Sequence, residues 1–221
     1  MSGLSIGGFH IHYHQGDLPE SFDGEGVSAV AIDTETTGLN PHRDRLCLVQ
    51  LTDGNGICHL VHFPPEYRQA CAGGLYPAPR LQRLLSDSSI VKLFHFGRFD
   101  IGMLQIHLGV DCRPVYCTKI ASKLVRTYTD RHGLKDLCRE LLGAELSKEQ
   151  QSSDWGAPTL SNEQLKYAAG DVVYLHRLRE KLDLMLAREG RSELAAECFD
   201  FLPCRARLDA GGFGEVDIFA Y

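Results

Sequence analysis

Apolar positions along the chain recur with two periods, and their order predicts the elements of an α/β domain. Short apolar runs between turn residues predict strands at about 27–34, 45–52, 56–62, 90–96 and 115–117. Apolar residues at helical spacing predict helices at 79–86, 98–108, 118–126, 133–142, 162–189 and 192–203. The turn DGNG at residues 53–56 predicts a hairpin. Hairpin-linked strands followed by alternating helices and strands favour one mixed sheet flanked by helices.

The first predicted strand leads into two carboxylates. Residues 27–32 form a nearly continuous apolar run, as expected for a strand covered on both faces. Asp33 and Glu35 follow two residues apart, so in extended chain both side chains project from one face. Adjacent anions resist ionising together, and a bound cation relieves that repulsion. All-oxygen sites suit Mg²⁺ or Mn²⁺, so this strand end is a candidate metal site.

Two further acidic positions lie on predicted helices. Asp100 falls in the first turns of the helix after strand 90–96, where a carboxylate also gains from the helix dipole. Asp171 lies on the predicted helix 162–189, and Tyr167 shares its face four residues earlier. A helical wheel places both on the border of a buried stripe, which lets them face a site at the sheet edge. Each position has an ordinary structural explanation, but the joint pattern favours a catalytic site.

The composition is that of an ordinary globular protein, with 43% hydrophobic and 24% charged residues among 221. No apolar run approaches the roughly 18 residues of a membrane helix and no secretory signal opens the chain, so we expect a cytoplasmic protein without membrane contact. The eight cysteines form no C-x-x-C pair and are expected to be reduced. A net charge of −6 argues against a surface for long nucleic acid, but it allows a local basic patch for a short substrate.

The two ends of the chain carry distinct patterns. The first 26 residues are polar and rich in glycine, with His10, His12 and His14 at alternate positions that share one face of a strand. A zinc site is one interpretation, and three histidines on an exposed edge strand is the favoured one. The tail 204–221 predicts a subunit contact through its apolar side chains, Phe213, Val216, Ile218 and Phe219.

The acidic segments resemble the three exonuclease motifs of the DEDD exonuclease superfamily. Asp33 and Glu35 resemble the first motif, Asp100 the second, and the pair Tyr167 and Asp171 the third. The tyrosine indicates the DEDDy branch, which includes ribonuclease D, because the histidine branch carries histidine five residues before the last aspartate and this chain has lysine there. Segments such as HQGDLP, FHFGRFD, CTKIASKL and QQSSDW extend the resemblance, to small bacterial members of this family, over nearly the whole chain.

This resemblance implies a ribonuclease H-like core in which residues 1–221 form a single 3′-5′ exonuclease domain, without the accessory helical domains of ribonuclease D. It also implies hydrolysis of very short RNA, dinucleotides above all, to nucleoside 5′-monophosphates by a homo-oligomer, a ring-shaped octamer. Two alternatives stay open. One is a general 3′-5′ exonuclease acting on RNA or DNA ends, and the other is a non-catalytic protein that binds dinucleotides.

Two divalent ions, Mg²⁺ or Mn²⁺, set the roles we expect for the acidic residues in phosphodiester hydrolysis. Asp33 is expected to bridge the ions. Glu35 and Asp171 would complete the shell of one ion, and Asp100 would help to hold the other. Tyr167 is expected to orient the attacking water, since an ordinary pKa near 10 makes tyrosine a poor base at neutral pH.

A second group of residues is expected to contact the substrate. By resemblance, Leu39 would wedge between two bases, and ordinary turn packing is the alternative. The densest basic region, from Lys119 to Lys135 and including Arg126, is expected to bind a terminal phosphate, with a solvated face as the alternative. Trp155 is either a substrate contact or a packing anchor. The expected substrate-binding residues are Thr34, Leu39, His95, Phe99, Lys119, Arg131, His132, Gln151 and Trp155.

Overall fold

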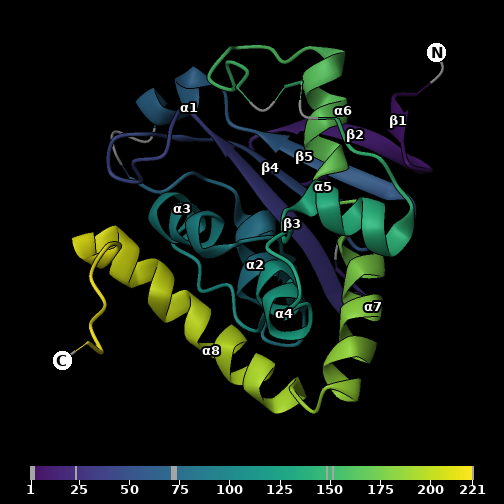
Figure 1. The fold of residues 1–221 in the computed structure, drawn as a ribbon. Helices are drawn as coiled ribbons and strands as arrows, with labels where there is room; N and C mark the ends of the chain where they lie inside the picture. The colour runs from purple at the N-terminus through teal and green to yellow at the C-terminus, as the bar shows by residue number, and fades with distance from the viewer. Residues whose placement is uncertain (1–2, 23, 71–73, 148, 151, 221) are drawn as a thin grey trace.

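The computed structural model describes residues 3–22, 24–70, 74–147, 149–150 and 152–220, which form a seven-stranded mixed sheet with flanking helices (Figure 1). The strands lie in the order β1-β2-β5-β4-β3-β6-β7. β3, β4 and β5 form an antiparallel meander; β6 runs parallel to β3, and β7 to β6. The bounds are β1 Ser5–Ile6, β2 Phe9–Gln15, β3 Ala29–Thr36, β4 Leu46–Thr52, β5 Ile57–His62, β6 Val91–Phe94 and β7 Val115–Cys117.

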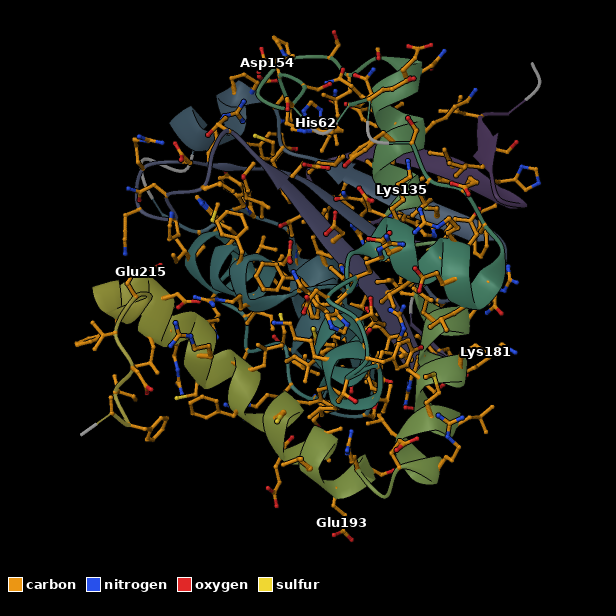
Figure 2. All side chains as sticks on the ribbon, in the orientation of Figure 1. His62, Lys135, Asp154, Lys181, Glu193 and Glu215 are labelled. Atoms are coloured by element: carbon orange, nitrogen blue, oxygen red, sulfur yellow. The ribbon has the colours of Figure 1, made fainter. Side chains whose placement is uncertain are left out.

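Helices connect the parallel strands and cover the sheet. Their bounds are α1 Pro65–Ala70, α2 Pro79–Ser86, α3 Arg98–Leu108, α4 Thr118–Val125, α5 Leu134–Leu137, α6 Asn162–Gly170, α7 Leu175–Arg188 and α8 Ser192–Leu208. Two π-helical segments, Cys138–Leu142 and Asp209–Phe213, extend α5 and α8. Charged side chains such as Lys181 and Glu193 point outward from α7 and α8 (Figure 2). The sequence therefore predicted the fold class and most of the elements correctly.

The hairpin between β4 and β5 follows from its turn residues. Gly54 and Gly56 have φ angles of 92° and 87°, which lie in the left-handed region that glycine tolerates best. The predicted hairpin is confirmed, with Leu51 opposite His59 in the first ladder positions. All seven residues of β4 are buried, so this strand belongs to the hydrophobic core. The meander thus fixes the register of β3, the strand that carries Asp33 and Glu35.

The predicted helix 162–189 is wrong as one helix. α6 begins at the predicted capping box, in which Ser161 accepts a hydrogen bond from the backbone N–H of Gln164, but it ends at Gly170. Residues 171–174 form a turn with short-range bonds, such as the N–H of Val172 to the carbonyl of Ala169, before α7 begins. A glycine followed by two buried β-branched valines disfavours continued α-helix. The break places Asp171 at the end of α6.

The last helix is longer than the predicted range 192–203. α8 runs to Leu208 and contains Pro203, which lacks an N–H and disfavours a helix interior. Its buried side chains include Phe199, Leu202 and Ala206, and the helix contacts α3, α4 and β7. Tertiary packing therefore overrides the local signal that predicted an earlier end.

The N-terminal histidines lie on β2, near the edge of the sheet. β1 pairs only with Phe9 and His10, so the following part of β2 forms the edge in the described chain, as the favoured interpretation expected. The described cysteines are free and five of them are buried, as predicted; Cys71 lies outside the described residues. None of the helices that the structure describes is long and apolar enough to cross a membrane.

Candidate active site

Three of the predicted carboxylates converge at the end of β3. Asp33 and Glu35 project from the same face of this strand, and Asp171 approaches from the end of α6. One oxygen from each of the three carboxylates lies within 4.8 Å of the others. Asp33, Glu35 and Asp171 are each partly shielded from solvent rather than freely exposed. The α6–α7 break and the β3–β4 register together build this group.

Asp100 lies beside this group, in the first turn of α3, and is almost completely buried. Its carboxylate Oδ1 accepts a hydrogen bond of 2.6 Å from the hydroxyl of Thr34. The negative charge of Asp100 is close enough to raise the pKa values of Asp33 and Glu35. The structure thus brings together the four carboxylates that the sequence singled out. Thr34, expected to touch substrate, here holds Asp100 in place.

Burial and mutual repulsion disfavour ionisation of the four carboxyl groups. Burial, followed by the charges of Asp171 and Asp100, raises the pKa of Glu35 to about 9. Burial also raises the pKa of Asp171 to about 7 and that of Asp100 to about 6. The pKa of Asp33 is raised by burial and by all three neighbours. Such crowded carboxylate oxygens fit divalent cations of the Mg²⁺ and Mn²⁺ type, whose charge compensates the repulsion.

This electrostatic arrangement predicts a stability that falls with rising pH in the absence of metal. In the unfolded chain these carboxyl groups have pKa values near 4, whereas in the folded chain those of Asp100, Asp171 and Glu35 are about 6, 7 and 9. The folded protein therefore holds more protons between these values, and stability is lost as pH rises through the folded pKa values. We expect the melting temperature in EDTA to fall by several degrees between pH 5 and pH 9, at about 2–4 °C per kcal/mol.

Differential scanning calorimetry at pH 5, 7 and 9 checks this expectation. Added Mg²⁺ should flatten the decline, because the cation takes over the role of the protons. Glu35→Gln should also flatten it in EDTA, since the substituted side chain cannot ionise. A melting temperature that rises across this range, or an unchanged slope in Glu35→Gln, would contradict the electrostatic account.

Tyr167 lies one turn before Asp171 on α6 and faces the carboxylates. Burial, followed by the charges of Asp171, Glu35 and Asp33, raises the pKa of its hydroxyl. A hydrogen bond from this hydroxyl lowers the pKa of Asp171 in turn. Its ring packs against Trp155, with centroids 6.0 Å apart. Tyr167 is therefore a neutral, well-fixed hydroxyl beside the acidic group, which suits orientation of a water molecule rather than proton abstraction.

Gln50 is a part of the site that the sequence analysis missed. It lies opposite Asp33 in the β3–β4 ladder, is fully buried, and donates a 3.0 Å hydrogen bond from Nε2 to Asp33 Oδ2. Its Oε1 has no hydrogen-bond partner among the residues that the structure describes. The detectable signal was a single amide side chain inside the apolar run LCLVQL. Gln50 fixes the orientation of Asp33, as outer-shell hydrogen bonds do for metal-binding carboxylates.

Replacing Gln50 by leucine should therefore weaken metal binding about 10–100-fold, because Asp33 loses the donor that orients it. Titration calorimetry with Mn²⁺ measures this affinity directly. Gln82→Leu is a matched control, since the Gln82 amide donates instead to the carbonyl of Leu108. Equal Mn²⁺ affinity in the Gln50→Leu variant and the unsubstituted protein would show that the hydrogen bond does not position Asp33.

The expected substrate-binding residues lie in several different environments. Leu39 is 82% exposed, as a base wedge requires. Phe99 packs partly against the hydrophobic core. His95 is hydrogen-bonded through Nδ1 to the hydroxyl of Thr118 at 2.9 Å. Trp155 is buried against Tyr167, a packing position that borders the site. Gln151 lies outside the described residues.

The basic region divides into exposed and buried members. Arg131 is exposed, whereas His132 is nearly buried and its Nδ1 hydrogen-bonds the hydroxyl of Ser122 at 2.8 Å. Arg126 is wholly buried and pairs with Glu140, so it does not belong to an exposed phosphate-binding stripe. A helical spacing of basic residues could not reveal this, because burial depends on the segment that folds over the helix.

Phe96 is a second feature that sequence reasoning missed. It has a left-handed backbone with φ of 64°, rare for an aromatic residue, and its side chain is 49% exposed. The ammonium of Lys119 lies 3.7 Å from the centre of its ring. Phe96 lines a cavity of about 450 Å³ together with Leu39 and Phe99. A smaller cavity of about 210 Å³ is lined by Tyr167 and Asp171, so open space adjoins the acidic group.

The fold and the site together define a class, the ribonuclease H-like nucleases that bind metal through a DEDD set of carboxylates. A family model described as 3′-5′ exonuclease matches residues 21–187, and the chain belongs to this family. The structure is similar over nearly its full length to Brucella melitensis NrnC, at 55% identity and a TM-score of 0.88, covering 96% of this chain and 98% of that one. The sequence segments described above resemble those of nanoRNase C, a small ribonuclease D-like enzyme. The structural match to NrnC confirms this resemblance.

Two further NrnC structures and a ribonuclease D sequence are also similar to this chain. Brucella melitensis NrnC is also known with bound Mg²⁺, at 53% identity and a TM-score of 0.86, and bound to pGG, at 54% identity and a TM-score of 0.88. Both cover 96% of this chain, and 98% and 99% of the NrnC chains, respectively. Ribonuclease D of Acidiphilium cryptum is 34% identical over 168 residues, 76% of this chain. The chain spans about 40% of the length of this ribonuclease D and of two further ribonuclease D relatives that it matches.

Proposed function

We propose that the protein is a metal-dependent 3′-5′ exoribonuclease that hydrolyses very short RNA, dinucleotides above all, to nucleoside 5′-monophosphates. The observation that carries this proposal is the convergence of Asp33, Glu35, Asp100 and Asp171 with Tyr167 beside open space. A short substrate is supported by the similarity to NrnC, whose structure has been solved with bound pGG.

The residues of the site then have distinct tasks. Asp33, Glu35 and Asp171 would hold divalent cations, with Asp33 shared between two, and Asp100 would help to hold the second. Two bound ions would supply charge for the phosphate oxygens and acidify water at neutral pH. Gln50 keeps Asp33 Oδ2 engaged and so orients the carboxylate. Tyr167 directs the attacking water by hydrogen bonding through its neutral hydroxyl, while Trp155 fixes the tyrosine ring.

The residues around the carboxylates support a short substrate. Leu39 and Phe96 present exposed apolar side chains in one cavity, which suits contact with bases. Lys119, Lys123, Arg131 and Lys135 are the basic side chains of this region that retain access to solvent, and we assign the terminal phosphate to Lys119 and Arg131 among them. The net charge of −6 disfavours a long polyanion, whose binding needs many phosphate contacts.

The exposed apolar side chains of the C-terminal tail support association of several copies of the chain. We propose that residues 1–221 act as one exonuclease domain, in keeping with one contiguous cluster of buried apolar side chains, and that copies associate as a ring octamer in the cytoplasm. The exposed apolar residues that support association are Phe213, Val216, Ile218 and Phe219. Sedimentation of the purified protein gives the test, and a monomer at micromolar concentration would contradict it.

A degradation series tests the function. The substrates are 5′-labelled RNAs of two to seven nucleotides and a matched DNA dinucleotide, each with Mg²⁺, with Mn²⁺ and with EDTA. The proposal expects fast, metal-dependent cleavage of the RNA dinucleotide and slow cleavage of longer chains and of DNA. Even trimming of every length would indicate a general exonuclease instead. Binding of the dinucleotide without cleavage in either metal would indicate the non-catalytic alternative.

A further inference from the structure

A cluster of three imidazoles lies on the sheet face opposite the catalytic carboxylates. His12 and His14 share one face of β2, and His59 lies directly beside His12 on the neighbouring parallel strand β5. His59 pairs with Leu51, one position from Gln50, whose side chain reaches Asp33 on the other face. The cluster and the active site therefore occupy opposite faces of the same sheet.

Two of the three imidazoles are spaced nearly as they would be on one metal ion, and the third lies next to them. His14 Nε2 and His59 Nδ1 are hydrogen-bonded at 3.0 Å, and a tetrahedral zinc ion that replaced this hydrogen bond would hold the two nitrogens about 3.4 Å apart. The ring centre of His12 lies 5.7 Å from that of His59 and 6.4 Å from that of His14. His12 is exposed at the surface, so a change of rotamer can direct its nitrogen to the point between the other two.

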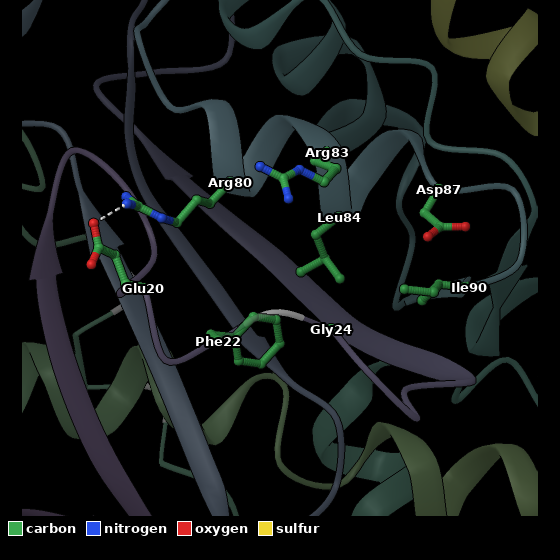
Figure 3. A pocket seen from close by; sticks show the side chains of 8 residues that line it. All are labelled: Glu20, Phe22, Gly24, Arg80, Arg83, Leu84, Asp87 and Ile90. Carbon is green, nitrogen blue, oxygen red and sulfur yellow. Dashed lines mark hydrogen bonds and ion pairs between the residues drawn. The ribbon is translucent and has the colours of Figure 1, made fainter.

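The surroundings keep two of these imidazoles in the form that binds metal. Burial, followed by the neighbouring histidines, lowers the pKa of His59 to about 4, and burial with His12 lowers that of His14. Unprotonated imidazole is the ligand for transition metals. The ring of Phe22 packs edge-on against His59 with centroids 5.0 Å apart, and also lines a pocket of about 120 Å³ (Figure 3). An apolar wall of this kind limits access of water to His59.

We propose that His12, His14 and His59 form a binding site for a transition-metal cation of the Zn²⁺ class, with one coordination position open. Imidazole nitrogens favour Zn²⁺, Ni²⁺ and Cu²⁺, whereas the carboxylate oxygens of the active site favour Mg²⁺ and Mn²⁺. A bound ion links side chains of the paired strands β2 and β5 near the edge of the sheet and so stabilises the position of β2. This site is independent of the proposed nuclease activity, because it lies on the other face of the sheet.

The test is titration of the tag-free, full-length protein with Zn²⁺ in saturating Mg²⁺, which occupies the carboxylates. We expect one Zn²⁺ per chain and a rise in melting temperature, with both effects weakened at least about tenfold in His12→Ala and His59→Ala. His10→Ala is the matched control, since His10 lies on the same strand but, among the described residues, takes no part in the ring contacts that connect His12, His14 and His59. It should bind Zn²⁺ like the unsubstituted protein.

Spectroscopy separates a built site from general surface binding. Co²⁺ bound to three imidazoles and water should give strong visible absorption, typical of four-coordinate geometry, which disappears in His12→Ala, a substitution at an exposed position that leaves the core intact. Asp33→Asn should leave this absorption unchanged. Equal Zn²⁺ affinity in His10→Ala and His12→Ala, or loss of binding only in Asp33→Asn, would overturn the proposal.

Discussion

Asp33→Asn is expected to lower the rate of dinucleotide hydrolysis by about 10⁴-fold or more, in the manner of other residues that act as one catalytic unit. Asp33 is the carboxylate whose pKa is raised by all three of the others, so it lies at the centre of the acidic group. An amide of the same shape can still accept the hydrogen bond from Gln50, but it supplies no charge to hold two cations. Loss of activity should therefore accompany loss of both bound Mn²⁺ ions in titration calorimetry.

The same substitution should not destabilise the metal-free protein. Asp33 repels Asp100, Asp171 and Glu35, and removing its charge relieves that repulsion. The melting temperature in EDTA at pH 8 is thus expected to match or exceed that of the unsubstituted protein. Asp111→Asn, which changes an exposed carboxylate paired with Arg113, is the control for a general change of charge. Retention of two Mn²⁺ ions in Asp33→Asn would refute the shared position of this carboxylate.

The positions of Asp33, Glu35 and Tyr167 relative to their neighbours were predictable because they obey local rules. Alternation along a strand places Asp33 and Glu35 on one face, and a four-residue helical spacing places Tyr167 beside Asp171. The approach of Asp171 to Glu35 was not predictable from this spacing. It depends on the turn after Gly170, where buried valines and a missing Cβ favour a short break over a continuous helix.

Side-chain contacts between residues far apart in the sequence could not be predicted from local patterns. Gln50 contacts Asp33 only because the hairpin sets the register between β3 and β4. His59 joins His12 and His14 because β5 pairs with a strand that precedes it by more than forty residues. In each case the contact depends on how two strands pair, which the local sequence pattern does not show.

The buried position of Arg126 illustrates the same limit for charge. Its helical spacing from Lys119 indicated an exposed basic face, but Glu140 and the backbone carbonyl of Arg131 enclose its guanidinium. The hydrogen bond from Arg126 to the carbonyl of Arg131, together with that between Ser122 and His132, anchors the segment that carries Arg131 and His132. The contribution of Arg126 to the basic region is therefore structural, whereas Lys123 and Arg131 remain exposed.

Tyr167→Phe separates orientation of water from metal binding. The substitution removes only the hydroxyl and keeps the ring that packs against Trp155, so the fold and the carboxylates should be unaffected. We expect the turnover number for a dinucleotide to fall by about 10²–10⁴-fold, the usual contribution of a positioned group in proton transfer and attack. Mn²⁺ stoichiometry and affinity should stay close to those of the unsubstituted protein, because the clustered carboxylates, rather than a neutral phenol hydroxyl, supply the oxygens that Mn²⁺ prefers.

Tyr174→Phe, four residues beyond the α6 end, provides the matched control. Its hydroxyl lies next to Gly7 at the N-terminal strand, away from the acidic group, and its loss should leave turnover unchanged. Unchanged turnover in Tyr167→Phe would remove this hydroxyl from the mechanism. Loss of Mn²⁺ binding in the same variant would instead give Tyr167 a structural role, since its hydrogen bond to Asp171 would then be what holds that carboxylate in place. The two measurements together thus decide whether the hydroxyl acts on water or on Asp171.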